Sequence, residues 1–216
     1  MITVLVVDDH ELIRAGIERL LADAPGIRVI GGVASGELAL KFAKEKSPQV
    51  VLMDVKMPGI GGLEATRRLI RQHPDIKVIV LTVYEGEPFP SKLLKAGALG
   101  YLTKGAEVEE MINAIRAVHS GKRYLGPAIA QQLALRSLNM NDEDKSPFDS
   151  LSERELEVLM LITAGKKVQA ISEKLCLSPK TINTYRYRLY EKLNVTTDVE
   201  LTHFALRHGL LESENT

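Results

Sequence analysis

VLVVDD, residues 4–9, is an uninterrupted apolar run that ends in two aspartates. Three later runs have the same form and also end in polar residues: VVLMD (50–54), VIVLT (78–82) and GYLTK (100–104). Short apolar runs of this kind are typical of parallel strands that are buried on both faces of a sheet. Because the carboxyl ends of parallel strands lie at one edge of the sheet, we expect the polar residues at these ends to share one crevice.

Segments whose apolar residues recur at helical spacing alternate with these runs, for example 13–21 and 108–118. A weaker strand pattern at 28–33 brings the number of strand–helix units before Gly121 to five. This alternation predicts an α/β fold with a doubly wound, five-stranded parallel sheet and helices on both of its faces. We therefore assign residues 1–121 to a first domain.

The rest of the chain has a different pattern. We expect residues 122–148 to form an exposed linker that contains a short helix from Pro127 to Arg136. Residues 149–216 show only helical periodicity and predict an all-α domain of four helices. Within it, Val168–Leu175, a short turn and Ser178–Leu193 have the lengths and capping residues of a helix-turn-helix.

Composition restricts the cellular setting more than the partners. The 216 residues include 28 Lys plus Arg and 28 Asp plus Glu, so the net charge does not select a class of ligand. Cys176 is the single cysteine, which rules out an internal disulfide and suits a reducing compartment. The sequence shows neither a signal peptide nor an apolar stretch of roughly 18 residues. We expect a cytoplasmic protein that does not insert into a membrane.

The polar residues at the strand ends suggest phosphoryl chemistry as a set, although each alone is more often an ordinary strand-end residue. Carboxylates about 4 Å apart repel by roughly 4 kcal/mol at an effective dielectric constant near 20, so Asp8, Asp9 and Asp54 together call for a cation. Oxygen ligands favour Mg²⁺ or Mn²⁺. Lys104 and Thr82 can hold phosphoryl oxygens. Asp54, on a different strand from the other acids, is the expected nucleophile, which would form an acyl phosphate.

This set of residues resembles the receiver domain of bacterial two-component response regulators. The motifs that carry the resemblance are Asp8-Asp9, Asp54 followed by Met57-Pro58, Thr82, and Tyr101 three residues before Lys104. The resemblance covers residues 1 to about 121 and implies a CheY/flavodoxin-like fold.

By this resemblance, Asp54 takes a phosphoryl group from a histidine kinase, and the backbone carbonyl of Lys56 helps to bind Mg²⁺. Thr82 and Tyr101 would form a switch, in which Tyr101 turns into the space that Thr82 leaves. Many receivers have a proline after the lysine, often with a cis peptide bond. This chain has Gly105 there, so we do not carry over the cis geometry.

A local excess of basic residues marks the helix-turn-helix. Seven basic and two acidic residues lie between Lys166 and Lys192, which is typical of a surface that faces phosphates. The residues that we expect to contact DNA are Lys180, Thr181, Asn183, Thr184, Arg186, Tyr187, Arg188 and Lys192. Asn183 and Thr184 can contact base edges, whereas the residues that suit phosphates are Lys180, Thr181, Arg186 and Arg188. For Tyr187, an equally good alternative is that it is a surface aromatic side chain that covers a junction between packed elements.

The helical domain resembles LuxR-type DNA-binding domains in LSERE (151–155), LSPKTI (177–182) and KL (192–193). Together with a receiver, this is the NarL/FixJ architecture. Longer segments are similar to the GacA/UvrY subgroup: MPGIGGLEATR (57–67), LCLSPKTINTYRYRLYEKL (175–193) and DVELTHFALRHGL (198–210).

The subgroup implies a membrane-bound hybrid sensor histidine kinase of the BarA/GacS kind as partner. It also implies double-stranded promoter DNA of small regulatory RNA genes as the target. Paired half-sites predict a homodimer on DNA, with helix 198–208 as the candidate contact and core packing as the competing role of that helix.

These observations predict a transcription factor that is activated by phosphorylation of Asp54, and not an enzyme. One alternative is a receiver whose C-terminal helices only dock proteins. Another is an aspartyl-phosphate hydrolase, but such enzymes usually have a second aspartate two residues after the nucleophile, where this chain has Lys56.

Overall fold

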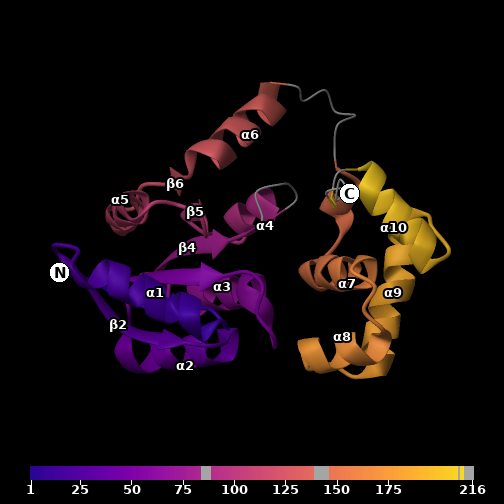
Figure 1. The fold of residues 1–216 in the computed structure, drawn as a ribbon, viewed down its shortest axis with the longest axis horizontal. Helices are drawn as coiled ribbons and strands as arrows, with labels where there is room; N and C mark the ends of the chain where they lie inside the picture. Colours follow the sequence, from indigo (N-terminus) through magenta and orange to yellow (C-terminus); the bar gives the residue numbers. More distant parts are fainter. Residues whose placement is uncertain (84–88, 139–145, 209, 212–216) are drawn as a thin grey trace. The chain divides into compact units, whose positions relative to one another are not determined.

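The computed structural model describes residues 1–83, 89–138, 146–208 and 210–211, and statements about the fold concern these ranges (Figure 1). The chain folds into two compact units, residues 1–138 and 139–216. The middle of the expected linker, 139–145, lies outside the described residues. Among the described helices, none has both the length and the apolar character that crossing a bilayer requires.

The first unit is built on a parallel sheet with the strand order β2-β1-β3-β4-β5-β6. The strands are β1 (Ile2–Val7), β2 (Ile27–Val33), β3 (Val50–Asp54), β4 (Lys77–Thr82), β5 (Gly100–Thr103) and β6 (Tyr124–Leu125). The doubly wound parallel sheet and its five predicted strands are confirmed. The structure adds β6 at one edge, paired with β5, from a segment for which the sequence predicts an exposed linker. A two-residue strand has no detectable period, so the sequence did not reveal it.

Helices cover both faces of this sheet. They are α1 (Glu11–Ala22), α2 (Gly36–Lys46), α3 (Gly61–Gln72), α4 (Phe89–Lys95) and α5 (Val108–His119). Val4 and Val6 of β1 pack into one core with α1 and α5, whereas Leu5 and Val7 pack into a second core with α2 and α3. This alternation explains why the strands are apolar throughout, since each strand contributes side chains to both cores. A further helix, α6 (Pro127–Leu138), ends two residues later than predicted.

The second unit is helical, as predicted. After the short 3-10 helix η1 (Pro147–Ser150), its helices are α7 (Glu153–Thr163), α8 (Val168–Leu175), α9 (Pro179–Leu193) and α10 (Asp198–Arg207). Cys176 takes the left-handed conformation, with φ of 52°, in the turn between α8 and α9. The Ser178 hydroxyl accepts the Thr181 backbone N–H at 3.1 Å and so caps α9. These two local features set the geometry of the helix-turn-helix.

Helix α3 begins directly against the backbone of the strand that ends in Asp54. Gly61 has φ of +70°, and the Gly62 N–H donates to the Val55 carbonyl at 3.0 Å. A Cβ atom on Gly62 would lie 1.8 Å from the Asp54 carbonyl oxygen. The glycine pair therefore allows α3 to start beside the end of β3, which fixes the backbone that carries Asp54.

Glu155 joins two helices of the second unit. Its carboxylate accepts the Ser152 backbone N–H at 2.6 Å, which completes a capping box at the start of α7. The same carboxylate is 2.6 Å from Nζ of Lys192, near the end of α9. Burial alone would raise the pKa of Glu155, but the hydrogen bonds to Lys192 and Ser152 outweigh it, so the pKa lies below its ordinary value of 4.5. Glu155 thus helps to set the position of α9 against α7.

Replacing Gly62 by alanine is expected to destabilise the first unit. The added methyl group meets main-chain atoms that cannot rotate away, so we expect a loss toward the upper end of about 1–3 kcal/mol. Gly16→Ala is the matched control, because a Cβ atom on Gly16, in α1, would meet no atom within 4 Å. This control should be neutral or more stable by roughly 0.5–1 kcal/mol. Urea unfolding followed by NMR signals of the sheet measures both, and equal stabilities would contradict the packing argument.

Glu155→Gln should destabilise the second unit in a pH-dependent manner. Glutamine can still accept the Ser152 N–H but loses the charge pair, which is worth about 1–2 kcal/mol because Lys192 is partly exposed and screened. The folded-state pKa of Glu155 is lowered, so its contribution is present above the ordinary pKa of 4.5 and is lost as the pH falls below it. Urea titrations followed by α7 and α9 NMR signals should therefore show a gap between wild type and variant at pH 7 that shrinks below pH 4.5. Glu191→Gln, an exposed change on α9, is the control, and a gap independent of pH would refute the assignment.

Candidate phosphoacceptor and nucleic-acid sites

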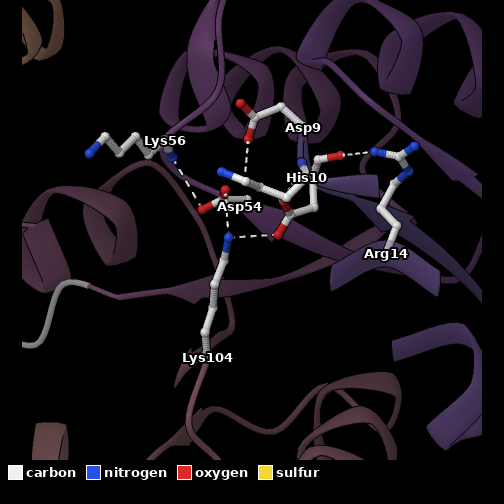
Figure 2. A network of polar contacts seen from close by, with 7 residues as sticks. Asp9, His10, Arg14, Asp54, Lys56 and Lys104 are labelled. Carbon is white, nitrogen blue, oxygen red and sulfur yellow. Dashed lines mark hydrogen bonds and ion pairs between the residues drawn. The ribbon is translucent and has the colours of Figure 1, made fainter. Parts of the chain in front are cut away.

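Three of the predicted residues meet at the carboxyl edge of the sheet, as Figure 2 shows in part. Asp8 follows β1 and Asp54 ends β3, and these residues are only 1% and 2% exposed. Lys104, which follows β5, places its Nζ 2.6 Å from Asp8 Oδ2 and 2.8 Å from Asp54 Oδ2. Asp9 lies beside them with a side chain that is 29% exposed. We call Asp8, Asp9, Asp54 and Lys104 the acidic pocket.

Backbone and side-chain groups around the pocket hold its carboxylates in place. The Lys56 backbone N–H donates to Asp54 Oδ1 at 3.2 Å. Arg14, on α1, donates from its guanidinium to the Asp8 carbonyl at 2.7 Å. His10 donates its backbone N–H to Asp8 Oδ1 at 2.9 Å, and its ring Nδ1 lies 3.2 Å from the same oxygen. Arg14 and His10 are not among the predicted site residues, although the position of His10 directly after two acids could have indicated it.

The two predicted switch residues are completely buried. Thr82 is the last residue of β4 and directly follows Leu81, which pairs with Asp54 across the sheet. The Thr82 carbonyl accepts the Lys104 backbone N–H at 2.8 Å. Tyr101 lies in β5 opposite Val80, with its side chain inside the protein. Both therefore lie on the strands that form the edge of the acidic pocket, within well-packed surroundings.

Charge and burial act on the pocket in opposite directions. Burial raises the pKa of Asp54, and the negative charge of Asp8 adds to this effect, whereas Lys104 partly counteracts it. Burial alone would lower the pKa of Lys104, but its hydrogen bonds to Asp54 and Asp8 outweigh burial, and the pKa is raised. Lys104 thus remains an ammonium group. One ammonium faces three carboxylates, so the pocket keeps an excess of negative charge when all of them are ionised.

The donor atoms of the pocket suit a divalent cation. Atoms of Asp8, Asp9, His10 and Asp54 lie within 4.8 Å of one another. Three of these four residues offer carboxylate oxygens, which are the ligands that Mg²⁺ prefers. The residues present therefore fit the magnesium site that the sequence predicts.

The predicted DNA-contacting residues all lie on α9, and its apolar residues face inward as expected. Ile182, Leu189 and Leu193 are buried. Five of the predicted residues are exposed: Lys180, Thr184, Tyr187, Arg188 and Lys192. The other three are half-buried: Thr181, Asn183 and Arg186. The helix thus has one face in the domain core and an opposite face that is rich in polar and basic groups.

Two of these residues have carboxylate partners inside the domain. The guanidinium of Arg186 donates to Asp198 Oδ1 at 2.8 Å and lies 2.7 Å from Oδ2, and the Tyr190 hydroxyl also donates to Oδ1. Lys192 is paired with Glu155. Within the described residues, the structure gives no carboxylate partner to the side chains of Lys180 and Arg188. The basic residues expected to contact DNA therefore fall into two groups. Arg186 and Lys192 already have a carboxylate partner inside the domain, and Lys180 and Arg188 have none among the described residues.

Known proteins match this chain in both units. The family described as response regulator receiver domain matches residues 4–116, and the family described as bacterial regulatory proteins, luxR family, matches residues 149–205. Response regulator GacA of Pseudomonas aeruginosa is 62% identical over 213 residues, which cover 99% of each chain. Response regulator UvrY of Escherichia coli is 56% identical over 214 residues, which cover 99% of this chain and 98% of UvrY. A solved structure of the response regulator RcsB in complex with DNA shares 25% identity and a TM-score of 0.59, over 94% of this chain and 96% of RcsB.

Proposed function

The chain belongs to the two-component response regulators that join a receiver domain to a LuxR-type DNA-binding domain, and we propose that Asp54 is its phosphoacceptor. The observation that carries this assignment is the position of the Asp54 carboxylate. It lies at the end of a central strand, with Lys104 on one oxygen and the Lys56 N–H on the other. Asp8 and Asp54 are both buried, but Asp54 lies on β3, whereas Asp8 and Asp9 both follow β1.

In the proposed reaction, an oxygen of Asp54 attacks the phosphorus of a phosphohistidine on a histidine kinase. The new bond joins that oxygen to phosphorus, and the phosphorus–nitrogen bond breaks with its electron pair returning to the imidazole. The Lys104 ammonium and the Thr82 hydroxyl hold phosphoryl oxygens as the charge is transferred. When bound, Mg²⁺ would be held by Asp8, Asp9, Asp54 and the Lys56 carbonyl and would supply positive charge for the phosphoryl group.

We further propose that the chain acts as an acceptor and switch, without turning over a substrate as an enzyme. The position two residues after Asp54 is Lys56, which cannot serve as the carboxylic acid of an aspartyl-phosphate hydrolase. In the proposed switch, Thr82 moves toward the phosphoryl group and Tyr101 fills the space that it leaves. Shifting such an equilibrium from 1:99 to 99:1 takes about 5.5 kcal/mol of differential stabilisation.

For DNA binding, we propose two roles among the eight predicted residues. Asn183 and Thr184 contact base edges. The sugar–phosphate backbone of the DNA is contacted or covered by Lys180, Thr181, Tyr187 and Arg188. Arg186 and Lys192 instead hold α9 against α10 and α7, because their charges are paired with Asp198 and Glu155. The exposed face that includes Lys180 and Arg188 supports this division.

The similarity to GacA and UvrY supports the remaining proposals. The phosphoryl donor is a membrane-bound hybrid sensor kinase of the BarA/GacS kind, and the targets are promoters of small regulatory RNA genes. The protein works in the cytoplasm and binds DNA as a homodimer. Val199 and Leu206 are exposed on α10, which supports that helix as the contact between the two copies.

Asp54→Asn should abolish phosphorylation. The amide cannot act as the nucleophile, so intact-mass spectrometry after incubation with acetyl phosphate and Mg²⁺ should show the phosphoryl adduct on wild type and none on the variant. Asp75→Asn, which changes an exposed carboxylate after α3, is the control and should label like wild type. A phosphoryl adduct on the Asp54→Asn variant would show that the acceptor is another residue.

The salt dependence of DNA binding should separate the basic residues of α9. Each phosphate contact contributes about 0.9 to the slope of log K against log salt, so Lys180→Gln should flatten this slope by roughly that amount. Arg186→Gln should weaken binding with little change of slope, because the Arg186 charge is already paired with Asp198. Fluorescence anisotropy on a promoter fragment between low and moderate salt measures both. Equal slope changes would contradict the division, and binding that is indifferent to salt would favour a protein-docking module.

A further inference from the structure

His10 lies beside the acidic pocket, and the proposed function leaves it without a role. It stands at the N-cap of α1, but its side chain makes no capping hydrogen bond. The ring instead places Nδ1 3.2 Å from Asp8 Oδ1 and 3.0 Å from Asp9 Oδ1. The imidazole is thus directed at two carboxylates, while 61% of the side chain remains exposed.

The position of this nitrogen is compatible with coordination of the same cation. Two ligand atoms that each lie about 2.1 Å from one ion are at most about 4.2 Å apart. The donor atoms of Asp8, Asp9, His10 and Asp54 fall within 4.8 Å of one another, which exceeds this limit by only about half an ångström. In Figure 2, Lys104 reaches Asp54 from below, whereas Asp9 lies above Asp54. His10 contacts Asp9, which has no ion pair with Lys104 among the described contacts, as well as Asp8, which does.

The alternative role for His10 is that of a hydrogen-bond donor to Asp8 and Asp9. One Nδ1 proton can satisfy one of these oxygens well, yet Nδ1 lies about equally close to both. The Asp9 oxygen is also buried, and within the described residues it meets no other hydrogen-bonding group. Two carboxylates and a neutral imidazole all present lone pairs, which a single cation can share.

We propose that Nδ1 of His10 is a fourth side-chain ligand, which makes the acidic pocket selective for transition-metal dications such as Zn²⁺ over Mg²⁺. The proposal rests on the cation site of the proposed function and extends its ligand set. Imidazole is a good ligand for Zn²⁺, whereas Mg²⁺ is held by oxygen atoms and water. Loss of His10 should therefore reduce the affinity for Zn²⁺ much more than the affinity for Mg²⁺.

The test compares Zn²⁺ and Mg²⁺ binding by calorimetry to the full-length wild type, His10→Ala and His119→Ala, all at one pH of about 8, because protons compete with metal ions for their ligands. His119 is exposed at the end of α5 and serves as the matched control. We expect His10→Ala to bind Zn²⁺ at least about tenfold more weakly and Mg²⁺ within about twofold of wild type, with His119→Ala unchanged. In wild type, the ¹⁵N signal of His10 Nδ1 should shift on addition of Zn²⁺.

The outcomes are distinct. An unchanged Zn²⁺ affinity in His10→Ala, an equal loss for both metals, or a His10 signal that does not respond to Zn²⁺ would each overturn the role of His10 as a ligand. A loss in His119→Ala equal to that in His10→Ala would also overturn it, since binding would then be spread over surface histidines. If wild type binds neither metal, the proposed cation site itself fails. Phosphorylation of Asp54 by acetyl phosphate then reports separately on the phosphoacceptor.

Discussion

The ammonium group of Lys104 lies between two buried carboxylates, and the charge balance of the acidic pocket depends on this contact. It links the end of β5 to the ends of β1 and β3 through Asp8 and Asp54. Two acids in a nearly dry position would repel each other strongly, and burial of each one is also unfavourable. The lysine offsets part of this repulsion. One ammonium cannot balance three carboxylates, so the pocket favours binding of a cation. An anionic phosphoryl group is tolerated there only when a cation is bound with it.

The predictable and unpredictable parts of the molecule differ in the range of the interactions that create them. The strand ends could be predicted because parallel strands place their carboxyl ends at one edge, so a run such as VVLMD fixes where Asp54 lies. Local capping also follows from short sequence patterns, such as the capping box that Ser152 and Glu155 form at the start of α7. The second partner of Glu155 is Lys192, far along the chain, and no local pattern announces such a pair. Strand β6 escaped detection because two residues are too few to show a period.

Ion pairs between distant residues also change the interpretation of the basic helix α9. Composition alone counts Arg186 and Lys192 as positive charges available to DNA. In the folded domain, each is 2.6–2.7 Å from a carboxylate on another element, Asp198 at the start of α10 and Glu155 on α7. These ion pairs fix the recognition helix from both sides at some expense in net positive charge. The arrangement favours a rigid helix with few well-placed cations over a flexible one with many.

Phosphorylation of Asp54, as proposed, would act on a site with little freedom to adapt gradually. The backbone of Asp54 is held against α3 at Gly62, where not even a methyl group fits. Thr82 and Tyr101 are completely buried, so neither can shift without leaving a space or filling one. Close-packed interiors respond to such demands by exchanging one packing for another, since intermediate positions lose contacts on both sides. A new doubly charged group that draws Lys104 and Thr82 toward itself would thus select between two discrete arrangements. A local change in charge can in this way produce a change of shape at a distance from the acidic pocket.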